Sequence, residues 1–62
     1  MNLTTQEKMD VLHALSVAAT TYKNFATSEM LDGNLALAAG FRETAERFDA
    51  LYEFIEASGA EE

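Results

Sequence analysis

The chain has 62 residues, no cysteine, no proline and a formal net charge of −7. This length allows one domain, which buries only about 60% of its unfolded surface, so close helix packing or self-association has to add stability. Without cysteine no disulfide can form. His13 is the one histidine, so the chain lacks the set of Cys and His ligands that a zinc site usually has. The N-terminus lacks a secretory pattern and no apolar run approaches the roughly 20 residues of a membrane span, so we expect a cytoplasmic protein without cofactor or metal.

The first helix is predicted over about residues 5–30. Thr4 and Glu7 have the spacing of a capping box, in which each side chain accepts a hydrogen bond from the backbone N–H of the other residue. No Gly or Pro interrupts the chain from there to Met30, and the apolar residues recur with the period of a helix rather than that of a strand.

A turn is predicted over residues 31–34. Gly33 adopts a positive φ at little cost, and Asp32 or Asn34 is suited to cap the next helix. Because so short a link brings consecutive helices side by side, we expect an antiparallel hairpin.

The second helix is predicted over about residues 35–57, with a frayed acidic tail at 58–62. Six residues spaced alternately by four and three form a heptad seam, which we expect to face the first helix: Leu37, Phe41, Thr44, Phe48, Leu51 and Ile55. In this arrangement Phe48 and Leu51 are core residues. Ala38, Ala45 and Tyr52 flank the seam.

The predicted fold class is all-α, an antiparallel two-helix hairpin that self-associates into a four-helix bundle or a larger ring. Two helices cover only one flank of each other, so the rest of a wide apolar stripe needs another copy of the chain. The predicted interface residues are Val11, Leu15, Ala18, Tyr22, Phe25 and Phe54.

No catalytic residue is predicted. Asp10, His13 and Ser16 recur every three residues and superficially resemble a triad, but one exposed helix offers them neither an oxyanion site nor a dry pocket. Isolated glycines form no phosphate loop. We therefore expect a protein that is not an enzyme.

Four acidic residues recur every three or four positions along the second helix: Glu46, Asp49, Glu53 and Glu56. They are either a solvated helix face or a contact surface for a basic protein partner. The net charge disfavours nucleic acid and anionic membranes, because phosphate binding depends on clustered Lys and Arg.

The layout of the chain resembles that of the Rop-like RNA-binding helical hairpins. The resemblance lies in the length, the opening Thr5-Gln6-Glu7-Lys8, the central Leu31-Asp32 turn and the acidic tail. It implies a dimeric four-helix bundle. The RNA-binding strip of that family lies on the first helix, where this chain has little positive charge: His13, Val17, Thr20, Thr21 and Lys23.

The second helix is similar in spacing to the closing helix of small phage helical-hairpin proteins that form rings and sequester cyclic nucleotides. The similar positions are Leu37, Ala38, Phe48, Ala50, Leu51 and Ile55. This likeness implies an anionic ligand at subunit boundaries, where Lys23, Arg42 and Arg47 would bind phosphate together with Lys8.

Three hypotheses on function follow. The first is a non-enzymatic, acidic, oligomeric module that acts by protein–protein interaction, as an inhibitor or accessory protein of a phage or another mobile element. The second is an oligomeric sponge for a nucleotide second messenger. The third is a Rop-like RNA-binding regulator.

Overall fold

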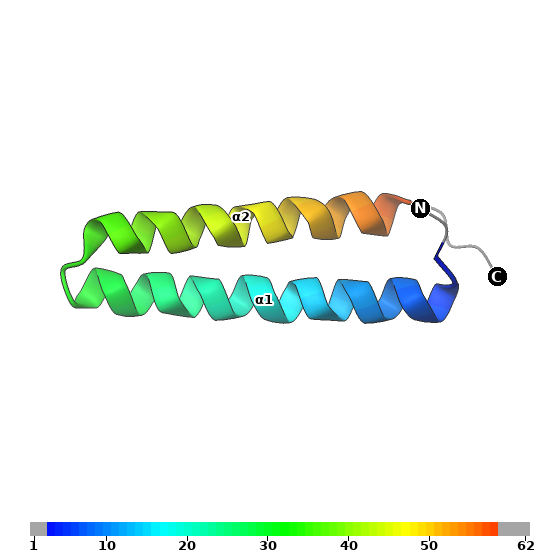
Figure 1. The fold of residues 1–62 in the computed structure, drawn as a ribbon, viewed down its shortest axis with the longest axis horizontal. Coiled ribbons are helices and arrows are strands. Elements are labelled where there is room, and N and C mark those ends of the chain that lie inside the picture. Colours follow the sequence, from blue (N-terminus) through cyan, green and yellow to red (C-terminus); the bar gives the residue numbers. More distant parts are fainter. Residues whose placement is uncertain (1–2, 59–62) are drawn as a thin grey trace.

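The computed structural model describes residues 3–58 and contains two helices, α1 (Thr5–Leu31) and α2 (Leu35–Ala57). The helices lie side by side and run in opposite directions, which confirms the predicted hairpin (Figure 1). Of the predicted tail at 58–62, Ser58 is the C-cap residue of α2, and residues 59–62 lie outside the described residues. Within the described range, neither helix is long and apolar enough to cross a membrane.

The predicted capping box opens α1. The backbone N–H of Glu7 donates to Oγ1 of Thr4 at 3.1 Å, and the backbone N–H of Thr4 donates to Oε1 of Glu7 at 3.0 Å. Two N–H groups that would lack a partner at the helix start are thereby hydrogen-bonded.

The turn is a Schellman motif centred on Gly33, whose φ is +82°. The Gly33 N–H donates to the Met30 carbonyl at 3.1 Å, and the Asn34 N–H donates to the Glu29 carbonyl at 2.8 Å. Asn34 is the N-cap residue of α2, but its side chain makes no capping hydrogen bond and instead donates to Oε2 of Glu29 at 2.7 Å. The amide therefore ties α2 back to the end of α1.

Alanines line the contact between the helices. The fully buried residues within 3–58 are Ala19, Ala26, Ala38 and Ala45, each 1–4% exposed and spaced by seven in each helix. Residues seven apart lie on one side of a helix, so a stripe of methyl groups on α1 meets a similar stripe on α2. Small side chains at the contact permit a close approach of the two helix axes.

The predicted seam of α2 is wrong in its orientation. Phe41, Phe48 and Ile55 are half-buried, but Leu37 is 56% exposed and Leu51 is 49% exposed. Ala38 and Ala45, predicted to flank the seam, occupy its place against α1. The difference follows from the register of the short turn, which turns the alanines inward and leaves the larger residues at the edge of the contact.

Lys8 joins the two helices at the end opposite the turn. Its ammonium donates to the carbonyls of Glu56 at 3.0 Å and Ser58 at 2.6 Å. A cation at the C-terminus of a helix meets carbonyls without helical partners and the negative end of the helix dipole.

The hairpin is elongated, with extents of 48 × 14 × 12 Å and a radius of gyration of 14.2 Å. A compact chain of this length would have a radius of gyration of about 11 Å. No large side chain among the described residues is fully buried, so a single hairpin lacks the core of an ordinary domain.

Candidate functional site

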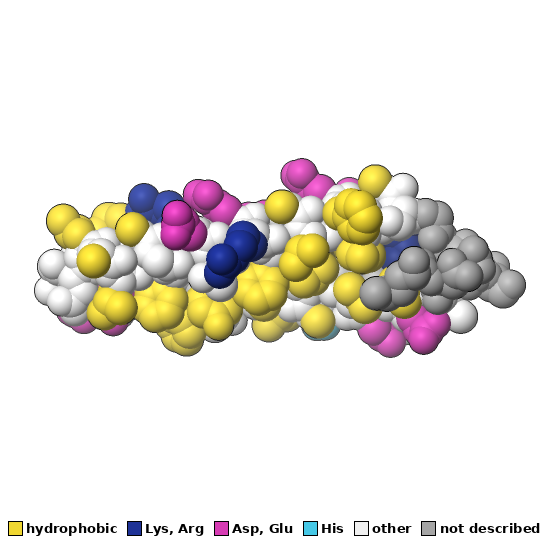
Figure 2. Space-filling view, turned by 45° about the horizontal axis from the view of Figure 1, so that its top comes forward, with side chains coloured by type: hydrophobic (Ala, Val, Ile, Leu, Met, Phe, Trp, Pro, Cys, Tyr) yellow, Lys and Arg dark blue, Asp and Glu magenta, His cyan; other side chains and the backbone are white. Residues whose placement is uncertain are grey.

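One side of the hairpin is apolar across both helices. We define this apolar face by eleven residues: Val11, Leu15, Ala18, Tyr22 and Phe25 from α1, and Leu37, Phe41, Thr44, Phe48, Leu51 and Ile55 from α2. At about 100° per residue, all of them lie to the same side of the buried alanines. Figure 2 shows hydrophobic side chains as a band along the middle and lower part of the molecule, with a basic side chain reaching into the band and acidic side chains above it and at the lower edge near both ends.

Aromatic rings hold the middle of the apolar face together. Tyr22 stacks on Phe48, with ring centroids 5.7 Å apart and planes at 17°, and lies 5.9 Å from Phe41. Phe25 lies 5.8 Å from Tyr22 and 5.4 Å from Phe41. Such offset and tilted pairs are favourable, and they fix these side chains in place. Even so, Phe25 remains 47% exposed.

The structure brings five of the six predicted interface residues together on the apolar face and separates the sixth. Phe54 lies nine positions after Ala45, which is about half a turn away around α2. It therefore points outward, away from α1, and is 68% exposed. A heptad pattern alone does not distinguish these two sides of α2.

The four predicted partner-binding residues lie on the side of α2 opposite the apolar face, and we call them the acidic ridge: Glu46, Asp49, Glu53 and Glu56. Asp49 is half-buried and its Oδ2 forms an ion pair with Nζ of Lys23 at 3.0 Å. Because both side chains are about half exposed, this pair contributes little to stability. The other three side chains are exposed to solvent.

The three predicted phosphate-binding cations do not converge within one hairpin. Lys23 pairs with Asp49, whereas Nη2 of Arg47 donates to Oγ1 of Thr44 at 3.2 Å. Arg47 and Arg42 are five positions apart and so point to different sides of α2. An open hollow of about 360 Å³ on the outer side of α2 includes Arg47, but Glu43 and Glu46 also line it. This acidic lining is unfavourable for an anion.

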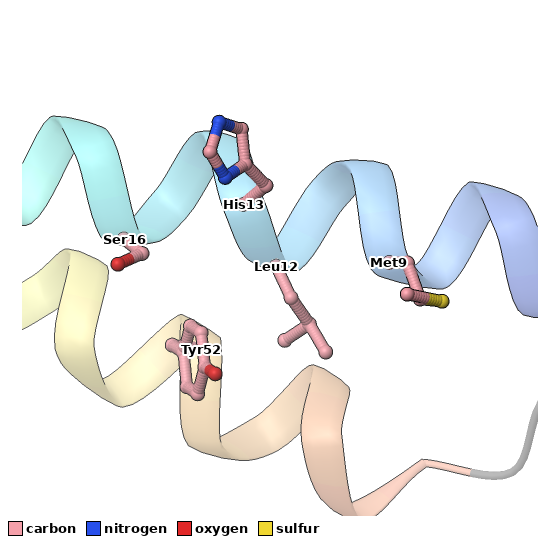
Figure 3. A pocket seen from close by; sticks show the side chains of 5 residues that line it. All are labelled: Met9, Leu12, His13, Ser16 and Tyr52. Carbon is pink, nitrogen blue, oxygen red and sulfur yellow. The ribbon is translucent and has the colours of Figure 1, made fainter.

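The polar row of α1 does not form a catalytic unit. His13 and Ser16 line an open hollow of about 310 Å³ together with Met9, Leu12 and Tyr52. Figure 3 shows His13 extending away from α2, whereas Leu12 points toward it. Asp10 accepts a hydrogen bond from Nε2 of Gln6 at 3.0 Å and does not line this hollow.

Comparisons with known proteins give no further assignment: no protein-family model, no curated protein and no solved structure matches the chain. The fold and its surfaces define the molecule as a helical hairpin with an apolar face on one side and an acidic ridge on the other.

Proposed function

We propose that this chain is a non-enzymatic binding module that self-associates through its apolar face and binds a basic protein surface through its acidic ridge. In this role it acts as an inhibitor or accessory protein of a phage or another mobile element. The observation that carries the proposal is the segregation of the two surfaces on opposite sides of one hairpin, because both can then be occupied at once.

Surface area supports self-association. The hairpin has an accessible surface of 4524 Å² at a mass of 6.8 kDa. A compact monomer of this mass would expose about 4000 Å². Half-exposed Phe25, Leu37 and Leu51 contribute to this excess, and a second hairpin placed on the apolar face would cover them in a four-helix bundle.

Charge supports a basic partner. Eleven acidic residues oppose four basic ones. Lys23 neutralises only Asp49 on the acidic ridge and leaves Glu46 and Glu53 exposed. A field of one sign attracts an oppositely charged surface and speeds the encounter, and salt weakens this attraction.

Capture from a host lysate tests the proposal, with two charge-matched double variants. Glu46→Gln/Glu53→Gln removes two charges from the acidic ridge, and Asp10→Asn/Asp32→Asn removes two charges elsewhere. We expect the wild type and the second variant to retain the same basic protein, and the first variant to lose it. Capture that does not differ between the two variants, or no capture by the wild type, would contradict the proposed partner.

A further inference from the structure

We propose that two hairpins pair with their apolar faces together and their turns at opposite ends, so that α1 lies on α1 and α2 on α2 of the partner subunit. The two-fold axis then passes beside Ala18. This inference rests on the proposed self-association and adds the arrangement of the two copies.

The apolar residues of α1 are arranged symmetrically about Ala18. Val11 lies seven positions before it and Phe25 seven positions after it, while Leu15 and Tyr22 lie three before and four after. When two α1 helices cross antiparallel at Ala18, each large aromatic residue meets a smaller aliphatic one of the partner subunit. Alternation of large and small side chains is what allows two surfaces to interdigitate.

The same symmetry holds on α2, about position 46. Thr44 and Phe48 lie two positions to either side, Phe41 and Leu51 five, and Leu37 and Ile55 nine. An antiparallel crossing again pairs an aromatic ring with a smaller side chain at the two inner levels. The heptad seam of α2 therefore suits a second copy of α2 better than it suits the alanine stripe of α1.

Charges at the two ends of the α1 stripe agree with this arrangement. Lys8 lies ten positions before Ala18 and Glu29 lies eleven positions after it, and both side chains are half-buried. Opposite turns bring Lys8 to the level of Glu29 of the partner subunit, at both ends of the interface. The carbonyls of Glu56 and Ser58 take two of the three ammonium hydrogens of Lys8, which leaves one for this contact.

The hairpin offers enough area for a modest dimer interface. The whole side that carries the apolar face measures 48 by 14 Å, an outline of roughly 700 Å² per subunit, against the ~800 Å² that each partner contributes to a standard interface. The apolar residues of α2, from Leu37 to Ile55, span about 27 Å of this length. None of the eleven residues of the apolar face is charged, and Arg47 reaches the edge of the face where it donates to Thr44. A dimer with both turns at one end would have the same area, but it would bring like charges to the same end.

Single cysteines test the arrangement, because the chain has none of its own. An axis separation of about 8–10 Å puts the two Ala18 Cα atoms ~4–5 Å apart, within reach of a disulfide. We expect mild oxidation to convert Ala18→Cys mainly to a covalent dimer. Thr21→Cys, exposed on the outer side of α1, is the control and should stay mainly uncrosslinked.

With both turns at one end, Ala18 would instead face α2 of the partner subunit near Thr44. A mixture of Ala18→Cys and Thr44→Cys would then form the mixed disulfide, and Ala18→Cys alone would not crosslink. That result, in a protein that still sediments as a dimer, overturns the proposed arrangement and leaves self-association intact. A wild type that sediments as a monomer at high concentration overturns both.

Charge reversal gives an independent measurement by sedimentation. We expect Glu29→Lys to weaken the dimer several-fold, because it places two cations at the same level of the interface. Adding Lys8→Glu reverses the pair and should recover part of the lost dimer. Because it also removes the hydrogen bonds of Lys8 to the Glu56 and Ser58 carbonyls, Lys8→Glu alone is measured in dilute protein as the control for hairpin stability. A double variant that dimerises no better than Glu29→Lys counts against the proposed contact.

Discussion

At the scale of single residues, the capping box makes the stability of the start of α1 depend on pH. Hydrogen bonds from the backbone N–H of Thr4, and then from its side chain, hold the pKa of Glu7 below its ordinary value of 4.5. A lowered folded-state pKa stabilises the protein above the unfolded-state pKa, and this contribution disappears as the pH falls through the folded-state value.

We therefore predict that Glu7→Gln lowers the free energy of unfolding at neutral pH and that the difference from wild type vanishes as the pH falls below 4.5. Thr4→Ala should cost about 1 kcal/mol at neutral pH, since it leaves the Glu7 N–H without a partner. Urea unfolding at several pH values measures both effects. A Glu7→Gln difference that grows in acid would contradict the role given to this carboxylate.

Two glycines allow a matched prediction. A Cβ added to Gly40 would have no atom within 4 Å. Gly33 instead has a φ of +82°, a backbone conformation that residues other than Gly rarely adopt. Gly40→Ala should raise the free energy of unfolding by about 0.5–1 kcal/mol, because Ala restricts the unfolded chain and favours helix. Gly33→Ala should lower it by about 1 kcal/mol, because its side chain strains the turn. Thermal unfolding would refute this account if both substitutions changed stability in the same direction.

At the scale of the elements, the two helices and the turn were predictable because each has its own local signal. The capping box, the uninterrupted helical period and the Asp32-Gly33-Asn34 turn need no knowledge of tertiary contacts. The side of α2 that meets α1 was not predictable in this way. Two stripes run next to each other on α2, one of alanines and one of larger residues, and burial energy alone favours the larger ones. The register of the turn decides between them.

Truncation of the two predicted core residues, Phe48 and Leu51, should affect stability differently. Phe48 stacks on Tyr22 across the hairpin, so Phe48→Ala should cost about 3 kcal/mol already in dilute protein, before the contacts that Phe48 makes in the proposed dimer add to the loss. Leu51 is 49% exposed in the hairpin, so Leu51→Ala should act mainly by weakening self-association. Urea unfolding at low and high concentration separates the two variants. An equal loss of stability from both variants in dilute protein would show that Leu51 belongs to the hairpin core after all.

At the scale of the whole molecule, the candidate site was predictable in part. Five of the six proposed interface residues share the apolar face because they belong to neighbouring heptad positions of α1. Phe54 is an apolar residue that lies off the heptad seam of α2, and its place on the outer side of α2 depends on which stripe of that helix faces inward. Likewise, the pairing of Asp49 with Lys23 joins residues of different helices and is set by their register.

Phe25 and Phe54 therefore provide the last prediction. Stability of a self-associating protein rises with concentration, so the wild-type melting temperature should increase as the protein is concentrated. Phe25→Ser should remove most of this increase, because the ring leaves the apolar face, and should also lower stability in dilute protein by loosening the contacts with Tyr22 and Phe41. Phe54→Ser should leave the increase unchanged, although Phe54 is the more exposed ring. Calorimetry over a wide concentration range measures the slope, and loss of that slope in Phe54→Ser alone would move the interface to the outer side of α2.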